Sequence, residues 1–264
     1  MIPGITAQIG SGAGFEPPPL PTLPSEASIT HWFRADLETF RDDVGTPATS
    51  GDGVRVWGNL GSATSDPAVQ DTSGNRPIKR FGGLNGMPYL ECPLGDARFF
   101  NDLAITQRSG ITSLSAWRTF AFVIDDYDLA TERLNPITGS NLTNGGKFGT
   151  YLRTAAASSN LRFFKSNITL GVIAQPMICV FVVGSETSFR CVINGNYYSQ
   201  SQSTNGNSSA IAAMQFLRCM GSSAGSQYFD GKFYEFLAWG GSVAMNQANM
   251  EAVCDALNGI YEVY

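Results

Sequence analysis

The chain has 264 residues, of which 43% are hydrophobic but only 15% are charged, and 29 are glycine. This balance predicts a globular protein of short strands and loops, because long surface helices bring more Lys and Glu. The net charge of −5 and the lack of any basic run argue against a nucleic-acid partner. No stretch approaches the ~20 apolar residues of a bilayer-spanning helix, so membrane insertion is not expected.

The first 28 residues differ from the rest of the chain. They are rich in Gly and Pro, and their prolines between Pro17 and Pro24 favour polyproline II and exclude a helix. We therefore predict an extended arm over residues 1–28, followed by a single domain over residues 29–264. The arm carries apolar residues that a solvated linker rarely has, which indicates that it docks on its own domain or on a neighbour: Ile2, Ile5, Ile9, Phe15, Leu20 and Leu23.

Short segments with a period of two begin at Ile29. In the first of them, Trp32 is predicted on one face, and Ile29 and Phe33 on the other. Two further segments of this kind follow at residues 53–57 and 88–92.

The most apolar strand segments come later in the chain. Residues 177–183 are nearly all apolar, which predicts a central strand. Residues 188–193 run into Asn194-Gly195, the signature of a type I′ hairpin whose returning strand is 196–199. The remaining predicted strands are 118–124, 147–153 paired with 161–164, 214–220 and 228–239.

One amphipathic helix is predicted at the end of the chain. Asn246 is a candidate N-cap, and Met245 and Met250 are spaced as a hydrophobic staple around it. The residues with helical spacing are Met250, Val253, Cys254, Leu257 and Tyr261. The sequence thus predicts an all-β, two-sheet antiparallel sandwich with one C-terminal helix and an extended N-terminal arm.

Segments at both ends of the domain carry a family resemblance. They are 29–35, 53–59, 76–77, 84–90, and 229–239 with the helix that ends at Tyr261. These segments resemble concanavalin A-like and laminin G-like domains over residues 29–264, which implies a jelly-roll sandwich but no particular ligand. The chain departs from the family pattern at Leu37, where a Gly is usual, and at Gly58, where an Asp usually follows the Trp.

A second resemblance concerns the first five residues. Met1-Ile2-Pro3-Gly4-Ile5 is similar to the start of small structural proteins of tailed phages, several of which continue into laminin G-like domains. No secretory signal is expected. The five cysteines have no CxxC spacing. This favours buried free thiols, in a protein that is assembled in a reducing cytoplasm, over a disulfide framework. We therefore expect a virion protein that is assembled in the host cytoplasm.

Catalytic residues are not predicted. The one histidine, His31, lies inside a strand and is expected to be packed there, which excludes a His-dependent triad and a His-rich metal site. The paired-carboxylate E-x-D-x-E run of β-glucanases does not occur. On these grounds the protein is expected not to be an enzyme and to need no cofactor.

Two sets of binding residues are candidates. Asp126 and Asp128 follow a strand and could ligate Ca²⁺, although a solvated turn is the more common explanation for such a pair. Aromatic side chains near strand ends could form a platform for a sugar, or belong to the core: Trp117, Tyr127, Tyr197, Tyr198 and Tyr228.

The leading hypothesis is a non-enzymatic phage virion protein, either a capsid decoration protein or a tail or fibre component. Residues 1–28 would attach it to other virion proteins, its jelly roll would contact glycans of the host surface, and a homo-oligomer, with a trimer as first guess, is expected. The alternatives on the same fold are a polysaccharide-active enzyme and a stand-alone carbohydrate-binding module. The residues alone do not decide between them.

Overall fold

The computed structural model describes residues 18–62, 67–92, 118–125, 134–140, 147–155, 158–163, 166–171, 175–183, 188–201, 231–240 and 244–264. These ranges hold fifteen strands and one α-helix, α2 (Gln247–Tyr261), which confirms the predicted all-β fold with a C-terminal helix. The predicted strands 214–220 and the start of 228–239 lie outside the described residues.

The main sheet has eight strands in the order β14-β13-β12-β7-β15-β6-β5, with β1 also paired to β15. Its strands are β1 (Ile29–Arg34), β5 (Ile78–Arg80), β6 (Tyr89–Cys92), β7 (Arg118–Asp125), β12 (Met177–Val183), β13 (Ser188–Ile193), β14 (Asn196–Ser201) and β15 (Gly231–Trp239). The predicted central position of β12 is confirmed, because β7 and β13 flank it.

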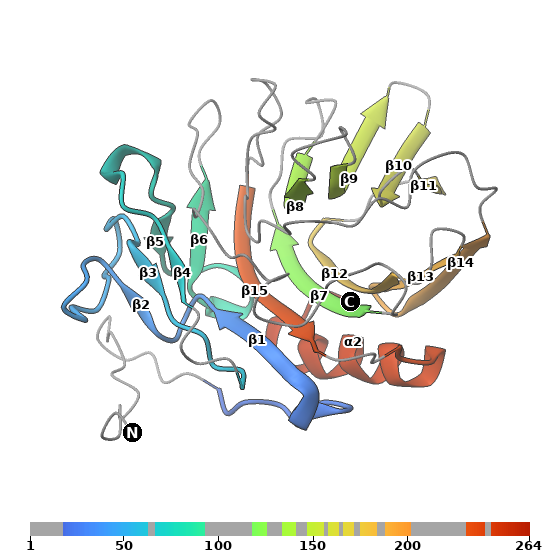
Figure 1. Cartoon of the computed structure of the whole chain (residues 1–264), viewed down its shortest axis with the longest axis horizontal. Coiled ribbons are helices and arrows are strands. Elements are labelled where there is room, and N and C mark those ends of the chain that lie inside the picture. The colour runs from blue at the N-terminus through green and yellow to red at the C-terminus, as the bar shows by residue number, and fades with distance from the viewer. Residues whose placement is uncertain are drawn as a thin grey trace.

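Strand β15 pairs with three other strands of this sheet. One edge pairs along its length with β7, and the other edge pairs first with β6 and then with β1. Residues near the two ends of the chain therefore lie side by side, as β1 and β15 do in Figure 1.

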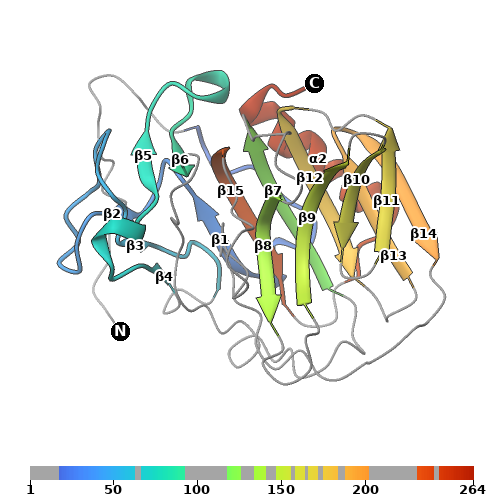
Figure 2. The ribbon, with the colours of Figure 1, turned by 90° about the horizontal axis from the view of Figure 1, so that it is seen from above.

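The layer opposite the main sheet is divided into two smaller sheets. One contains β2 (Thr39–Phe40), β3 (Val56–Trp57) and β4 (Ala68–Val69). The other contains β8 (Leu134–Ser140), β9 (Lys147–Ala155), β10 (Ser158–Phe163) and β11 (Ser166–Gly171), and includes the predicted β9–β10 pair. Figures 1 and 2 show β8–β11 over β7 and β12–β14, while α2 covers the opposite face of the main sheet.

The two faces of the main sheet carry different cores. The face toward the small sheets is aromatic, with ring contacts among Phe33, Trp57, Phe120, Phe122, Phe181, Phe233 and Phe236. The face toward α2 joins aliphatic residues of the sheet to the buried stripe of the helix. Trp32, Trp57 and Trp239 are all buried in these cores.

Local predictions for the hairpin, the helix and the cysteines are confirmed. Asn194 and Gly195 have φ values of 45° and 76°, as a type I′ turn requires. Met245 and Met250 are both buried in the cluster beneath α2. Of the five cysteines, the described four, namely Cys92, Cys179, Cys191 and Cys254, are buried free thiols.

Two local predictions need correction. A register shift in β1 between Ile29 and His31 places Ile29 in the same cluster as Trp32 on the helix side, although strict alternation predicts opposite faces. In the predicted strand 53–57, only Val56 and Trp57 pair as a strand, because Gly53 makes an isolated bridge.

The N-cap of α2 gives a first testable prediction. The Asn246 side-chain oxygen accepts a hydrogen bond of 2.9 Å from the backbone N–H of Asn249. Asn246→Ala is expected to lower the free energy of unfolding by about 1 kcal/mol, because that N–H loses its acceptor. Urea denaturation measures this loss. Asn246→Asp keeps the acceptor and is the control; equal losses in both variants would contradict the capping role.

Candidate functional site

A β-bulge in β15 places a carboxylate in the interior. Phe233 pairs with Ile124 and Glu235 with Val123, so that two steps along β15 match one step along β7. Tyr234 is the extra residue, and because of it Tyr234 and Glu235 both face α2. The bulge therefore brings a charged residue to a position that simple alternation would give to an apolar one.

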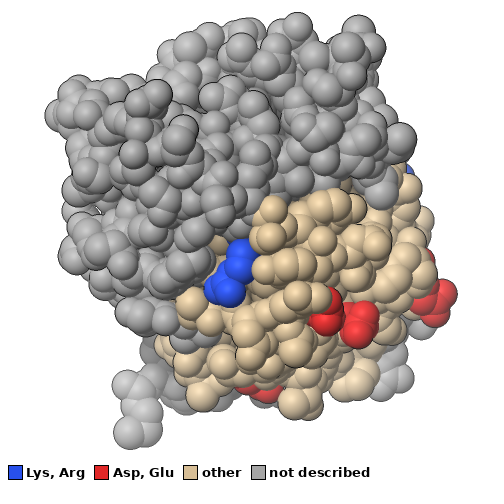
Figure 3. Space-filling view, turned by 90° about the vertical axis from the view of Figure 1, so that its right-hand side faces the viewer, with Lys and Arg blue, Asp and Glu red and all other residues tan. Residues whose placement is uncertain are grey.

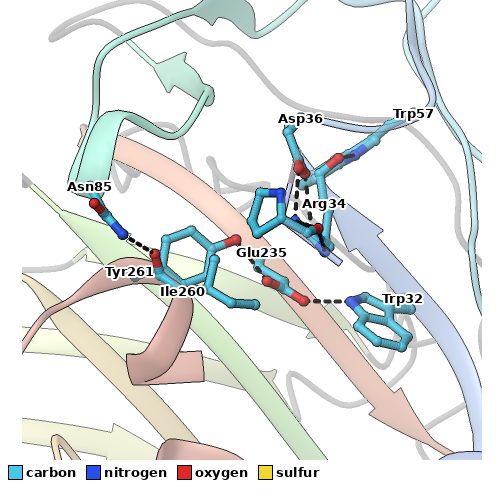
Figure 4. A network of polar contacts seen from close by, with 9 residues as sticks. Trp32, Arg34, Asp36, Trp57, Asn85, Glu235, Ile260 and Tyr261 are labelled. Atoms are coloured by element: carbon cyan, nitrogen blue, oxygen red, sulfur yellow. Dashed lines mark hydrogen bonds and ion pairs between the residues drawn. The ribbon is translucent and has the colours of Figure 1, made fainter. Parts of the chain in front are cut away.

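Glu235 accepts hydrogen bonds from two other elements. Its Oε2 accepts from the hydroxyl of Tyr261 on α2 at 2.7 Å. Its Oε1 accepts from the indole Nε1–H of Trp32 on β1. All three side chains are buried, and Figure 4 shows them meeting between the sheet and the helix.

Arg34 extends the network toward the N-terminal arm. Its Nε and Nη2 donate to the two carboxylate oxygens of Asp36 at 3.1 and 2.7 Å. Its Nη1 and Nη2 also lie 3.5 and 3.4 Å from the backbone carbonyl of Pro18. Further along the arm, Leu23 is buried in the core cluster and the Pro24 carbonyl accepts from Trp239 Nε1 at 3.1 Å.

Burial dominates the titration of this network. It raises the pKa of Glu235 to about 7, although Arg34 and the two hydrogen-bond donors act in the opposite direction. It also raises the pKa of Asp36 against the effect of Arg34. Lys79 donates from the interior to the Thr39 hydroxyl at 2.6 Å, and burial lowers its pKa to about 8.

A carboxylate that titrates near neutrality beside a tyrosine hydroxyl is chemically able to exchange protons. Glu235, Arg34 and Tyr261 are nevertheless at most 1% exposed, so no substrate reaches them in this structure. We assign this network a structural role, in which it joins α2, β1 and the arm to β15.

The raised pKa of Glu235 predicts how stability depends on pH. The folded protein binds this proton below about pH 7, whereas in the unfolded chain the carboxyl group has the ordinary glutamate pKa of 4.5 and releases the proton near that pH. Stability should therefore fall as the pH rises from 4.5 to 7, by about 3 kcal/mol from this group. Urea denaturation of the wild type and of Glu235→Gln across this range isolates the contribution. A constant difference between the two proteins would contradict it.

A second set of charged side chains crosses four adjacent strands of the main sheet, and we call it the charged row. It consists of Arg80 on β5, Glu91 on β6, Lys232 on β15 and Asp125 on β7. Arg80 Nε lies 2.8 Å from Glu91 Oε2, and Lys232 Nζ lies 4.0 Å from Asp125 Oδ2. The register pairs Lys232 with Glu91 on one side and with Asp125 on the other.

The charged row is accessible to solvent and adjoins an aromatic ring. Its side chains are between 20% and 38% exposed. Lys232 Nζ lies 5.3 Å from the ring centre of Tyr89. Tyr89 in turn contacts the ring of Tyr234, which contacts Tyr261. Successive ring contacts between three tyrosines therefore connect the buried Glu235 network to the charged row.

The predicted site residues are only partly within the described structure. Asp126, Asp128, Trp117, Tyr127 and Tyr228 lie outside it. Tyr197 and Tyr198 are consecutive residues of β14, and Tyr197 packs against the core cluster. Consecutive residues of a strand point to opposite faces, so these two rings do not form one platform.

The charged row was not predicted from the sequence. Only Glu91 and Lys232 lie in segments that the sequence predicts as strands, and nothing in the sequence shows that β5, β6, β15 and β7 are neighbours. Among the described residues, no group of three or more His, Cys, Asp or Glu side chains is placed to hold a metal ion. The predicted packing of His31 in its strand is confirmed, because the residue is buried.

One side of the molecule is mostly uncharged where the structure describes it. Figure 3 shows a few acidic and basic side chains among uncharged surface on the described part of this face. Within the ranges that the structure describes, no helix has the length and apolar character needed to cross a membrane.

In the comparisons with known proteins, only solved structures match this chain, and they identify its fold. No family model and no curated protein matches the sequence. A sialidase of Trypanosoma rangeli matches with a TM-score of 0.55 and 10% identity, over 90% of this chain and 34% of the sialidase. A GH54 arabinofuranosidase matches with a TM-score of 0.58 and 12% identity, over 91% of this chain and 61% of the enzyme.

These matches define the class as a β-sandwich, and they confirm the predicted fold class. The chain spans about one third of the sialidase and less than two thirds of the arabinofuranosidase. At this level of identity the likeness concerns the fold.

The prediction that the protein is not an enzyme is contradicted, because the matched structures are glycoside hydrolases. The prediction relied on the single histidine and on the missing run of acids within one strand. Acids can also be brought together from different strands, as Glu91 and Asp125 are on either side of Lys232. A motif within one strand is therefore not required for a pair of carboxylates.

Proposed function

We propose that this chain recognises a carbohydrate as the β-sandwich of a carbohydrate-active protein, and that the charged row beside Tyr89 contacts the sugar. The fold it shares with a sialidase and an arabinofuranosidase supports the proposal. The charged row is the observation that carries it, since carboxylates and cations can bind sugar hydroxyls while an adjoining tyrosine offers an apolar surface.

Binding to a glycan array, followed by titration of the best ligand, tests the proposal. The double variant Glu91→Gln/Asp125→Asn keeps the shape of the charged row but removes two acceptor charges. We expect it to bind at least about 10-fold more weakly, as loss of charge-assisted hydrogen bonds predicts. Asp71→Asn is the matched control, because Asp71 is an exposed acid that pairs with Arg55 away from the charged row. No glycan binding, or equal weakening in both, would contradict the proposal.

Glycan hydrolysis is a second candidate function, and the positions of Glu91 and Asp125 favour it. Both are cross-strand neighbours of Lys232, so their Cα atoms are about two strand spacings, or ~10 Å, apart. Inverting glycosidases hold their two carboxyl groups about 6.5–9.5 Å apart, a separation that side chains on Cα atoms ~10 Å apart can reach. Hydrolysis with inversion that is lost in both Glu91→Gln and Asp125→Asn would support this function. Activity that survives both substitutions would exclude this pair.

A phage virion remains our proposal for the setting of this domain, and it rests on the resemblance of residues 1–5 to phage structural proteins. In that setting, residues 1–28 would contact other virion proteins and the sandwich would contact glycans of the host surface. Electron cryo-microscopy of the source particle tests both statements, and its symmetry would give the oligomeric state. A particle that lacks this chain would refute the virion setting but not the recognition of carbohydrate.

A further inference from the structure

Glu235 connects three parts of the molecule that are distant in sequence. Tyr261 from α2 and Trp32 from β1 donate to its two oxygens. Arg34 is close enough to act electrostatically on the same carboxyl group. A change of charge on Glu235 therefore alters its interactions with α2 and with β1, and it also alters the interactions of Arg34 with other groups.

The N-terminal arm is among the partners of Arg34. The guanidinium holds Asp36 tightly, with Nη2 at 2.7 Å from Oδ2. Its two contacts with the Pro18 carbonyl are longer, at 3.4 and 3.5 Å. Hydrogen bonds weaken at such distances, so the contact of Arg34 with the Pro18 carbonyl is weaker than its contact with Asp36.

In the part of the chain that the structure describes, three other titratable groups bear on Glu235 and its partner Arg34. Asp36 follows β1 and accepts a hydrogen bond from Arg34, which also acts electrostatically on Glu235. Tyr261 faces Glu235 from α2. The positive charge of Lys79 on β5 acts to lower the pKa of Asp36. Strand β7 contributes the apolar Val123 as the partner of Glu235 in the sheet.

We propose that Glu235 is a proton-dependent tie between the sheet and the arm segment 18–24. When its carboxyl group is neutral, the Arg34 guanidinium is shared between Asp36 and the Pro18 carbonyl, and the arm stays in place. When the group is ionised, it attracts the guanidinium, the Pro18 contact weakens and the arm loosens. Burial raises the pKa of Glu235 to about 7, so the change falls within the neutral range.

Two tryptophan indoles report on this tie. The Nε1–H of Trp32 donates to Glu235, and that of Trp239 donates to the Pro24 carbonyl of the arm. Their ¹H–¹⁵N signals in the full chain, assigned by single Trp→Phe variants, can be followed from pH 5 to 9. The Trp32 signal reads the charge of Glu235, and the Trp239 signal reads the position of the arm.

We expect the Trp32 and Trp239 signals to move with one common midpoint, and both movements to disappear in Glu235→Gln. A Trp32 signal that titrates while that of Trp239 stays constant would overturn the coupling to the arm. Two constant signals would show that Glu235 does not titrate and would overturn the proposal as well. A Trp239 movement that persists in Glu235→Gln would assign the effect to another group. The wild-type titration decides the first two outcomes even if the variant folds poorly.

Discussion

Glu235→Ala is expected to lower the free energy of unfolding by about 3 kcal/mol or more at pH 7. The substitution leaves the Trp32 Nε1–H and the Tyr261 hydroxyl without the acceptor that each has in the interior. Each buried donor without a partner costs about 1–3 kcal/mol, and the cavity left by the side chain adds to the loss. Urea denaturation followed by circular dichroism measures it.

Glu235→Gln is the matched control for this prediction. The amide oxygen can accept from Trp32, and the amide nitrogen can donate to the Tyr261 hydroxyl, which rotates to accept. We expect its stability at pH 7 to be close to that of the wild type. If Ala and Gln have the same effect, the hydrogen bonds of Glu235 do not stabilise the fold.

Trp57→Ala is expected to cost about 3–5 kcal/mol, the range for removing a large buried aromatic side chain. Trp57 belongs to the three-stranded sheet, but its ring lies 5.4 Å from that of Phe33 and 6.0 Å from that of Phe233 in the main sheet. It is fully buried. Its removal therefore opens a cavity between the two layers of the sandwich.

Two other variants make the Trp57 result specific. Trp57→Phe keeps an aromatic ring but leaves the Arg34 carbonyl without the indole donor, so an intermediate loss of about 1–3 kcal/mol is expected. Val44→Ala changes a side chain that is 84% exposed and should be nearly neutral. A Trp57→Ala protein within 1 kcal/mol of the wild type would show that the ring does not join the layers.

The elements that the sequence predicts well are those that depend on neighbouring residues. The Asn194-Gly195 turn, the N-cap at Asn246 and the apolar run 177–183 each contain their own signal, and the structure confirms all three. The resemblance to jelly-roll domains gave the correct fold class for the same reason, since its motifs mark strands and turns.

What the sequence could not show is which distant strands meet and where a strand is irregular. Strict alternation over β15 places Glu235 on the same face as Phe233, but the bulge at Tyr234 turns Glu235 toward α2. The charged row likewise exists only because β6 and β7 flank β15, which brings Glu91 and Asp125 to Lys232. No local pattern encodes these two facts, so both polar clusters were missed.

The position of β15 also determines when the chain can fold. The pair Ile29–Trp239 joins residues separated by more than 200 positions, and β6 and β7 need the same strand as a neighbour. During synthesis, β1, β6 and β7 therefore emerge before β15, and the edges that pair with it have no permanent partner until it follows. Such long-range pairing slows folding and leaves open edges exposed to other chains. The late synthesis of Gly231–Trp239 thus sets the moment at which the main sheet can close.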